Sequence, residues 1–406
     1  MDGKNKALVR LSLPAILGIL LFALLLILPT LAGFYADHEA RSSWEKRALA
    51  QWPKLPWDHE DENYFASLQS FIDDHIGFAV ELNRFYRKLK FYIYRDNPIA
   101  NIVVGNDRFV FLGSHNSTNP HAILEALCVE ETRLERQASI KEGVGVLAWS
   151  AAILELRSSF AIFPSKPVLY PESLPLTVPS ALREACRGFS LRENFPAQLA
   201  ASRPQHIYYP LTEFQRLKDE PHFYPPGNFH AQGRSAHAFA RGFLAMLGIL
   251  VGEQYDRGAQ VVTEGADLQA MGFIYQQPVW HYPYKDFGVI RANEQPELVL
   301  RYYPLATDFA HFTTASPASD RTALVLTNSF GAFVAPHLAP GFREIFQVNI
   351  NDLDPIQTLP LMRAMQNQHA ITDVIYLVHD TGFINGFKLT QLSQAMKNLV
   401  IEDLRP

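Results

Sequence analysis

Ser329 follows an apolar, β-branched run and precedes a helical pattern in the stretch 322–333. A serine held on such a strand-to-helix turn can act as a nucleophile, with backbone N–H groups of the turn holding an oxyanion. Serine and asparagine at this place are also ordinary helix caps, so position alone leaves both interpretations open. Because a serine nucleophile needs a base, the histidines are the next residues to weigh.

Two histidines can serve as that base. His230 lies at the mouth of a predicted helix after a Pro-rich loop, two residues beyond Asn228. His379 follows a predicted strand and precedes Asp380, so it too reaches the carboxyl end of a strand. Their positions along the chain do not separate them. No spacing of ligand-type residues stands out, so we expect neither a metal nor a cofactor.

Apolar runs of strand length alternate with helical patterns in the second half of the chain. This alternation predicts an α/β domain with a central, mainly parallel sheet covered on both faces and with its site at the carboxyl strand ends. The expected strands lie at 260–263, 297–303, 323–326, 345–348 and 373–378, and the expected helices at 231–247, 331–338, 356–368 and 388–399.

The first half of the chain shows similar patterns. Residues 102–113 predict a hairpin, and residues 160–163 and 206–209 predict further strands. Helical periodicity covers 60–94, as one or two amphipathic helices, and 121–155, with an interruption around 143–145.

The N-terminus predicts a membrane anchor. Lys4, Lys6 and Arg10 precede an uncharged run over residues 11–32, which is long enough to cross a hydrocarbon core of about 30 Å. The run exceeds the apolar stretch of a cleavable signal peptide, so we favour an uncleaved anchor. The basic residues before it and the acidic residues after it leave the body outside the cytoplasm.

Composition limits the partners and the domain plan. The chain has 406 residues, 48% of them hydrophobic, so it can bury a large core. Its formal net charge of −5 lacks the excess of positive charge that nucleic-acid binding requires. We expect three parts: a cytoplasmic tip with the anchor over 1–36, a linker with an amphipathic helical segment over 37–100, and the α/β domain over 101–406.

Two cysteines, Cys128 and Cys186, lie in the part expected outside the cytoplasm. Disulfides persist in such compartments, so we favour a bridge between them, with two buried thiols as the alternative.

Several motifs occur in the order found in one family. The chain resembles the exported O-acetyltransferases of bacterial exopolysaccharides, the AlgJ/AlgX type, whose core is related to SGNH hydrolases. The matching stretches are WEKRALAQWPKLP, DDHIGF, IVVGNDRFVFLG, FAIFPSKPVLYPESLP, GNFHAQG and TNSFG. The resemblance implies a three-layer SGNH-hydrolase-like domain behind one transmembrane helix.

The same resemblance assigns roles to residues. Ser329 matches the acyl-accepting nucleophile and His230 matches its base, whereas Asn228 and Asn328 stand where the family has aspartates. An amide oxygen at Asn228 can accept the imidazole N–H and fix a tautomer, but it does not stabilise an imidazolium as a carboxylate does. His379 with Asp380 is the alternative base pair.

The activity implied by the resemblance is acetyl transfer through an acetyl-serine to an alginate- or cellulose-like exopolysaccharide. Its acetyl donor would be a membrane-bound O-acyltransferase, and the chain would be a single-pass protein of the inner membrane with its bulk in the periplasm. The alternative is a catalytically weakened subunit that binds polysaccharide or scaffolds the export complex. A carbohydrate esterase that uses water as the acceptor is a third possibility.

Overall fold

A computed structural model describes residues 12–35, 38–39, 41, 49–53, 63–94, 102–114, 119–191, 194–267, 275–292, 297–302, 309–351, 353–385 and 387–403. The chain forms two compact units, Met1–Tyr94 and Arg95–Pro406. The basic residues Lys4, Lys6 and Arg10, on which the orientation of the anchor was predicted, lie outside the described residues.

The elements described in the first unit are helices. The apolar run forms α1 (Leu13–Phe34), and the amphipathic segment forms α3 (Tyr64–His75), α4 (Ala79–Lys88) and the π-helix η1 (Leu89–Tyr94). Within the described part of the chain, residues Leu13–Gly33 make the one helix that is long and apolar enough to cross a membrane. The helical segment breaks at Gly77, where the chain turns between α3 and α4.

A central sheet organises the second unit, and its described strands run in the order β4-β3-β11-β9-β10-β8-β7. The strands are β3 (Arg157–Phe163), β4 (Ile207–Tyr208), β7 (Val289–Ala292), β8 (Ala310–Thr314), β9 (Thr322–Thr327), β10 (Glu344–Asn349) and β11 (Asp373–His379). The pairs from β4 through β10 are parallel, and β8 and β7 add an antiparallel edge. The predicted α/β fold with a mainly parallel sheet is confirmed.

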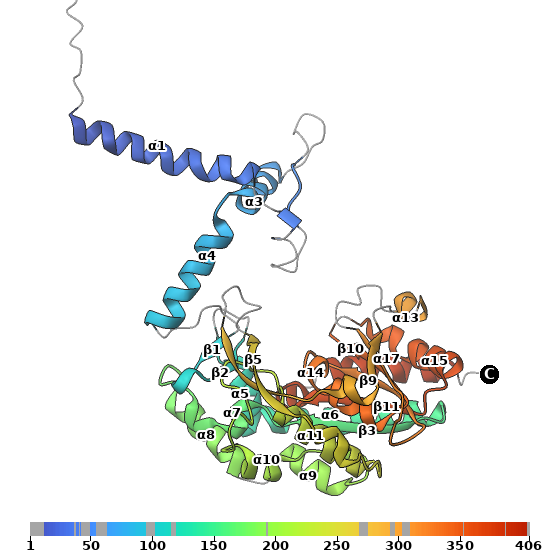
Figure 1. The fold of residues 1–406 in the computed structure, drawn as a ribbon. Coiled ribbons are helices and arrows are strands. Elements are labelled where there is room, and N and C mark those ends of the chain that lie inside the picture. The colour runs from blue at the N-terminus through green and yellow to red at the C-terminus, as the bar shows by residue number, and fades with distance from the viewer. Residues whose placement is uncertain are drawn as a thin grey trace, which may run out of the picture. The chain divides into compact units, whose positions relative to one another are not determined.

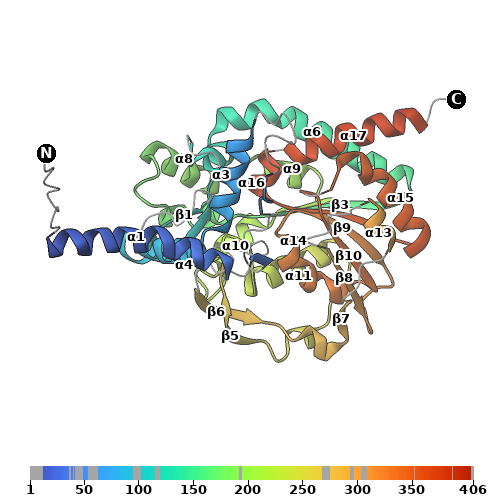
Figure 2. The same cartoon turned by 90° about the horizontal axis from the view of Figure 1, so that it is seen from above.

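Helices cover both faces of this sheet (Figures 1 and 2). One face carries α6 (Glu130–Ile153), α15 (Thr358–His369) and α17 (Phe387–Asp403); the other carries α11 (Arg234–Met246) and α14 (Gly331–Leu338). Every residue of β9 and β11 is buried, as expected for parallel strands enclosed between two helical layers.

Two short hairpins lie outside the central sheet. The first joins β1 (Ile102–Val104) to β2 (Val110–Leu112), as its sequence predicted. The second joins β5 (Gln260–Gly265) to β6 (Gln276–His281). Residues 260–263 were expected as a strand of the α/β alternation, but they belong to this separate hairpin.

Two further expectations from the sequence are wrong. Residues 297–303 were expected as a strand, whereas Glu297–Tyr302 forms the helix α13. A short apolar run fits a buried strand and a buried helix turn equally well, and here Leu298 and Val299 are buried in a helix. Residues 143–145 do not interrupt α6; the chain instead breaks at Val129, between α5 (Ala122–Cys128) and α6.

Gly143 continues α6 rather than breaking it. A Cβ at this position would lie 3.5 Å from the Oγ of Ser393 on α17, an ordinary van der Waals distance, so the packing of α6 against α17 does not require glycine here.

A disulfide joins Cys128 at the end of α5 to Cys186 in α8 (Ser180–Leu191). It ties together two helices that precede and follow β3, and both cysteines are buried.

Candidate active site

Ser329 lies on a tight turn at the carboxyl end of β9. Asn328 caps this turn, because its Oδ1 accepts the Phe330 N–H at 3.2 Å and its carbonyl accepts the Gly331 N–H at 3.0 Å. A Cβ at Gly331 would overlap the side chain of Thr327, so the turn requires glycine there. Since Asn328 does the capping, the hydroxyl of Ser329 is available for chemistry.

His230 is the histidine that meets this hydroxyl. Its Nε2 lies 2.8 Å from Ser329 Oγ, although the two residues are 99 positions apart in the chain. The imidazole stacks on the ring of Phe333 and meets the edge of Phe330, with ring centroids 4.9 and 5.0 Å away. Both phenylalanines belong to the segment that begins at Ser329, so one stretch carries the hydroxyl and holds the imidazole that faces it.

Asp267 supplies a carboxylate to the other side of the imidazole. Its Oδ2 lies 3.0 Å from His230 Nδ1, and it also accepts the backbone N–H groups of Phe229 and His230, each at 2.9 Å. The Nδ1 contact departs from the ideal line of a hydrogen bond, and it becomes an ion pair when His230 is protonated. The structure therefore contains a serine, a histidine and an aspartate in the order needed for nucleophilic catalysis.

The electrostatics of the site favour a charged Asp267. Burial acts to raise the pKa of this carboxyl, but His230, through its charge and its hydrogen bonds, and then the charge of Lys166 together bring the pKa below its ordinary value. An ionised carboxylate at this position can stabilise the imidazolium that forms when His230 takes a proton.

Asn228 does not take the place of the acid. Its Oδ1 accepts the backbone N–H of Asp267 at 2.7 Å, and its Nδ2 donates to Gln232 Oε1. It thus fixes the backbone that carries the carboxylate instead of contacting the imidazole. The sequence predicted that Asn228 contacts the imidazole of His230. Asp267 makes that contact instead, because the segment after β5 folds back over the loop that carries the histidine.

Buried polar contacts hold this loop in place. Gly227 N donates to Gln277 Oε1 at 2.7 Å, and Lys166 Nζ donates to the carbonyls of Pro225 and Pro226 at 2.8 and 2.6 Å. Lys166 follows β3 directly and is almost fully buried. Contacts from a strand end and from the β5–β6 hairpin therefore fix the loop just before His230.

The alternative pair, His379 and Asp380, makes different hydrogen bonds. His379 Nδ1 accepts the Gly382 N–H at 3.0 Å, while Asp380 accepts the N–H groups of Ser165 and Thr381 and the hydroxyl of Tyr209. Burial, followed by the charge of His230, lowers the pKa of His379 to about 3. Neither residue of this pair bonds to Ser329.

Asp267 is the residue of this arrangement that sequence reasoning missed. It follows the strand β5, 37 positions after His230, in a stretch where Glu264 is equally acidic. A single acidic residue beside a hairpin has no distinguishing pattern, since acidic residues at such places are ordinary solvated side chains. Asp267 reaches His230 only when the hairpin folds over the loop, and no local sequence pattern encodes that tertiary contact.

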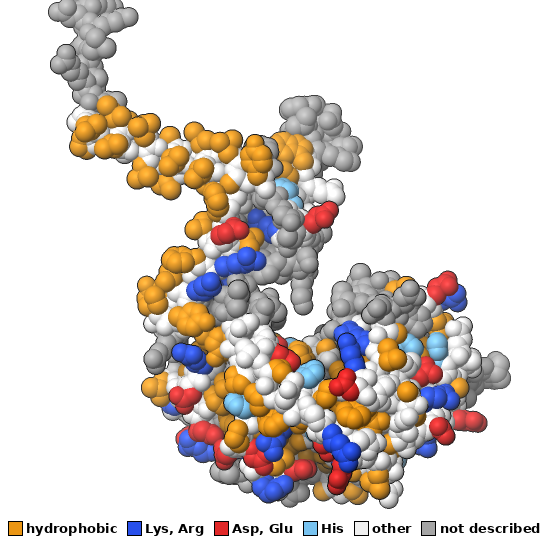
Figure 3. Space-filling model, viewed as in Figure 1, with side chains coloured by type: hydrophobic (Ala, Val, Ile, Leu, Met, Phe, Trp, Pro, Cys, Tyr) orange, Lys and Arg blue, Asp and Glu red, His pale blue; other side chains and the backbone are white. Residues whose placement is uncertain are grey.

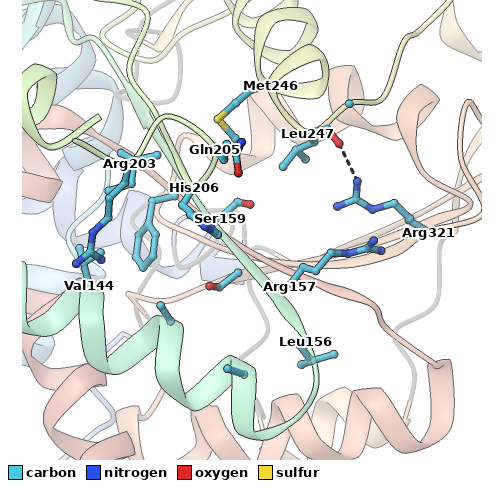
Figure 4. A pocket seen from close by; sticks show the side chains of 16 residues that line it. Val144, Leu156, Arg157, Ser159, Arg203, Gln205, His206, Met246, Leu247 and Arg321 are labelled. Atoms are coloured by element: carbon cyan, nitrogen blue, oxygen red, sulfur yellow. Dashed lines mark hydrogen bonds between the residues drawn. The ribbon is translucent and has the colours of Figure 1, made fainter. Parts of the chain in front are cut away.

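A cavity of 840 Å³ lies at the opposite, amino-terminal edge of the sheet (Figure 4). Arg157 and Arg321 line one side and Arg203 the other. Both Arg157 and Arg321 bind the buried carboxylate of Asp373, so these ion pairs account for the positions of the two arginines. This cavity is separate from the serine site.

Comparisons with known proteins give only distant likenesses. No family model matches the chain, and no curated protein matches it. Among solved structures, the chain is similar to a DHHW family protein from Eubacterium siraeum at 12% identity and a TM-score of 0.43, over 64% of this chain and 88% of that one.

Two further structures show similar values. Bacillus cereus PatB1 with a sulfonyl adduct has 15% identity and a TM-score of 0.46, over 70% of this chain and 95% of that one. The O-acetyltransferase domain of Pseudomonas putida AlgJ has 12% identity and a TM-score of 0.43, over 73% and 99%. At such values these likenesses carry no argument about activity, so a functional assignment depends on the geometry of the site and the motifs of the sequence.

Proposed function

We propose that the chain is an O-acetyltransferase that forms an acetyl-serine at Ser329 and passes the acetyl group to a hydroxyl of an exopolysaccharide. The observation that carries this proposal is the unbroken set of contacts from Asp267 through His230 to Ser329. Such a set activates a serine for acyl transfer whatever the fold that holds it.

In the first step His230 Nε2 takes the proton of the Ser329 hydroxyl as Oγ attacks the acetyl carbonyl of the donor. The C–O bond to the donor's leaving group breaks, and the imidazolium returns its proton to that group. Asp267 stabilises the transient imidazolium. The backbone N–H of Ser329 has no hydrogen-bond partner among the described residues, so it is free to donate to the oxyanion.

In the second step a sugar hydroxyl gives its proton to His230 Nε2 and attacks the acetyl-serine. The ester bond to Oγ breaks, Ser329 recovers its proton from the imidazolium, and the acetylated sugar leaves. Transfer and hydrolysis share this chemistry and differ in whether a sugar or water attacks, so the acceptor assignment depends on the motif resemblance.

The resemblance also supports the setting of the reaction. We propose that α1 anchors the chain once in the inner membrane with the second unit in the periplasm, because α1 is of spanning length and carries no charged residue. Acetyl-CoA is a cytoplasmic donor, so a membrane-bound O-acyltransferase that hands the acetyl group outward is the partner we propose. The polysaccharide is alginate-like or cellulose-like.

The alternative of a weakened polysaccharide-binding or scaffold subunit depended on Asn228 and Asn328, which stand where the family has aspartates. The position of Asp267 weakens the argument from Asn228, since a carboxylate does contact the imidazole. The enzyme is therefore the better supported function.

The test is a Ser329→Ala exchange in the producing cell, with the acetyl content of the secreted polymer measured. We expect acetylation to be lost while polymer secretion continues. The matched control is Ser319→Ala, because Ser319 donates to the Gly341 carbonyl away from the site and its loss should leave acetylation unchanged. Full acetylation by the Ser329→Ala variant would contradict the proposal, and loss of secretion itself would favour the scaffold.

A further inference from the structure

An apolar stripe runs along α4 and η1, with four of its members exposed and Leu89 half-buried. Its members are Leu82, Phe85, Tyr86, Leu89 and Ile93, which recur at three- and four-residue steps and so share one side of a helix. Leu82 is 63% exposed, Phe85 60% and Ile93 66%. Exposed apolar surface of this extent on one side of a helix marks a contact with a lipid or protein partner.

The same segment also carries four basic side chains. Arg84, Arg87, Lys88 and Lys90 accompany the stripe, with Glu81 as the one acidic residue between Ala79 and Tyr94. Figure 3 shows hydrophobic side chains gathered along α1 and along one side of α4, with basic side chains beside them on α4. Phenylalanine, leucine and tyrosine on one side with lysine and arginine on the other is the composition of helices that lie in a membrane interface.

A backbone contact ties the start of α4 to the end of the apolar helix α1. Gly77 N donates to the carbonyl of Pro29 at 2.8 Å. A Cβ at Gly33 would overlap the carbonyl of His75, and one at Gly77 would overlap Ala32, so both glycines are needed for this close approach. Because α4 begins at Ala79, directly after the contact, it starts at the level of the last turns of α1.

We propose that α4 and η1 form a second membrane contact, lying in the lipid surface where α1 leaves the bilayer. The stripe Leu82–Phe85–Tyr86–Leu89–Ile93 inserts among the acyl chains, and the basic side chains lie among the lipid head groups. Continuity with α1 and the basic, aromatic composition favour a lipid surface over a protein groove. This inference rests on the membrane anchoring included in the proposed function.

The role of such a contact is to fix the orientation of the chain at the membrane. A single spanning helix leaves the segment after it free to swing, whereas a helix lying in the interface restricts that motion. For an enzyme that receives its acyl group from a membrane protein, this restriction raises the effective concentration of the site near the donor.

The test uses depth-dependent fluorescence quenching on the full chain in nanodiscs of phosphatidylcholine. Single cysteines are introduced as Phe85→Cys in the stripe, Lys88→Cys on the basic side and Ile19→Cys in α1, and each is labelled with a quenchable fluorophore. Cys128 and Cys186 are joined in a disulfide, so the introduced thiol is the one that reacts. Phe85 and Lys88 are both exposed, so neither exchange removes a core contact.

We expect lipids brominated on the acyl chain to quench the labels at 19 and 85 several-fold more than the label at 88. Strong quenching at 19 with equal, weak quenching at 85 and 88 would overturn the inference and point to a protein partner on the stripe. Weak quenching at 19 as well would overturn it together with the anchor. Neither result bears on the acetyl transfer, which the Ser329→Ala exchange tests separately.

Discussion

Two histidine–aspartate pairs lie at the carboxyl edge of one sheet, and they differ in how they are bonded. His230 is 12% exposed, with Asp267 beside one ring nitrogen and the Ser329 hydroxyl beside the other. His379 is buried, and a backbone N–H occupies its Nδ1. Its neighbour Asp380 receives its hydrogen bonds from Ser165, Tyr209 and Thr381 rather than from a histidine.

The difference teaches that adjacency in sequence does not by itself make a catalytic pair. β11 ends at His379, and Asp380 is the first residue of the helix α16 (Asp380–Asn385), where its carboxylate accepts hydrogen bonds from Ser165, Thr381 and Tyr209 instead of meeting the imidazole. Asp267 is distant in sequence and arrives from a separate hairpin, so it can approach His230 from the side that the serine leaves open. Our four predictions test this contrast.

The largest effect is expected from Asp267→Asn. Asparagine keeps the shape of the side chain and can still accept the backbone N–H groups of Phe229 and His230, but it removes the charge that stabilises the imidazolium. In a serine hydrolase such an exchange lowers kcat by about 10⁴-fold, and we expect a loss of that order with an activated aryl acetate as donor. The measurement is the steady-state rate of the purified full chain.

A third histidine–aspartate contact provides the control for this variant. His237 Nε2 lies 2.7 Å from Asp256 Oδ1, and Tyr284 joins His237 to His337 rather than to the serine. Asp256→Asn should therefore leave kcat close to the wild-type value. Asp256 is exposed, so equal losses in the two variants would mean that the removal of either charge lowers the rate for reasons unrelated to the contact with His230.

Asp380→Asn should change the pH dependence of stability rather than the reaction. Burial raises the pKa of Asp380 from its ordinary 3.8 to about 6, against the hydrogen bonds from Ser165, Tyr209 and Thr381. A raised folded-state pKa means that the stability contribution is complete below about pH 4 and is lost as the pH rises through about 6. The difference is worth about 3 kcal/mol at 1.36 kcal/mol per pKa unit.

The measurement is urea unfolding of the wild type and the Asp380→Asn variant between about pH 4 and pH 8. The wild type should lose stability relative to the variant as the pH rises, because asparagine does not titrate. Parallel curves would show that Asp380 keeps the same pKa in the folded and unfolded chain.

Much of the fold could be predicted because its signals are local. The buried strands β9, β10 and β11 consist mainly of apolar residues, and the turn at Ser329 follows directly from the end of one of them. The antiparallel strands β7 and β8 gave no such run, since β8 alternates buried and half-buried residues, and the helix Glu297–Tyr302 is too short for its period to be recognised.

The site was predictable only where its residues stand next to a recognisable element. Ser329 follows a strand and His230 precedes a helix, whereas Asp267 is defined by a contact between a hairpin and a loop. The motif resemblance points to Asn228, because motifs match positions along the chain and not positions in space. A base and a nucleophile can thus be inferred from local context, but their acid depends on the tertiary fold.

Asn228→Ala should have an intermediate effect on the rate. Removing the acceptor of the Asp267 N–H leaves the carboxylate in place but frees its backbone to shift, and a displacement of about 1 Å can lower a rate by about 10²-fold. We expect kcat to fall while KM stays near its wild-type value. Asn228→Asp keeps an acceptor oxygen and should restore most of the rate; failure of this rescue would indicate that the amide group itself is required.

The smallest effect is expected from His379→Asn, which keeps an acceptor for the Gly382 N–H. Because burial and then the charge of His230 lower the pKa of His379 to about 3, this imidazole is neutral from about pH 5 to pH 8 and adds no titration to the rate profile there. We expect kcat/KM to fall less than about tenfold, with an unchanged acid limb, whereas His230→Asn should abolish most of the rate. A loss in His379→Asn as large as in His230→Asn, with the acid limb displaced, would transfer the base role to His379 and reverse the contrast between the two pairs.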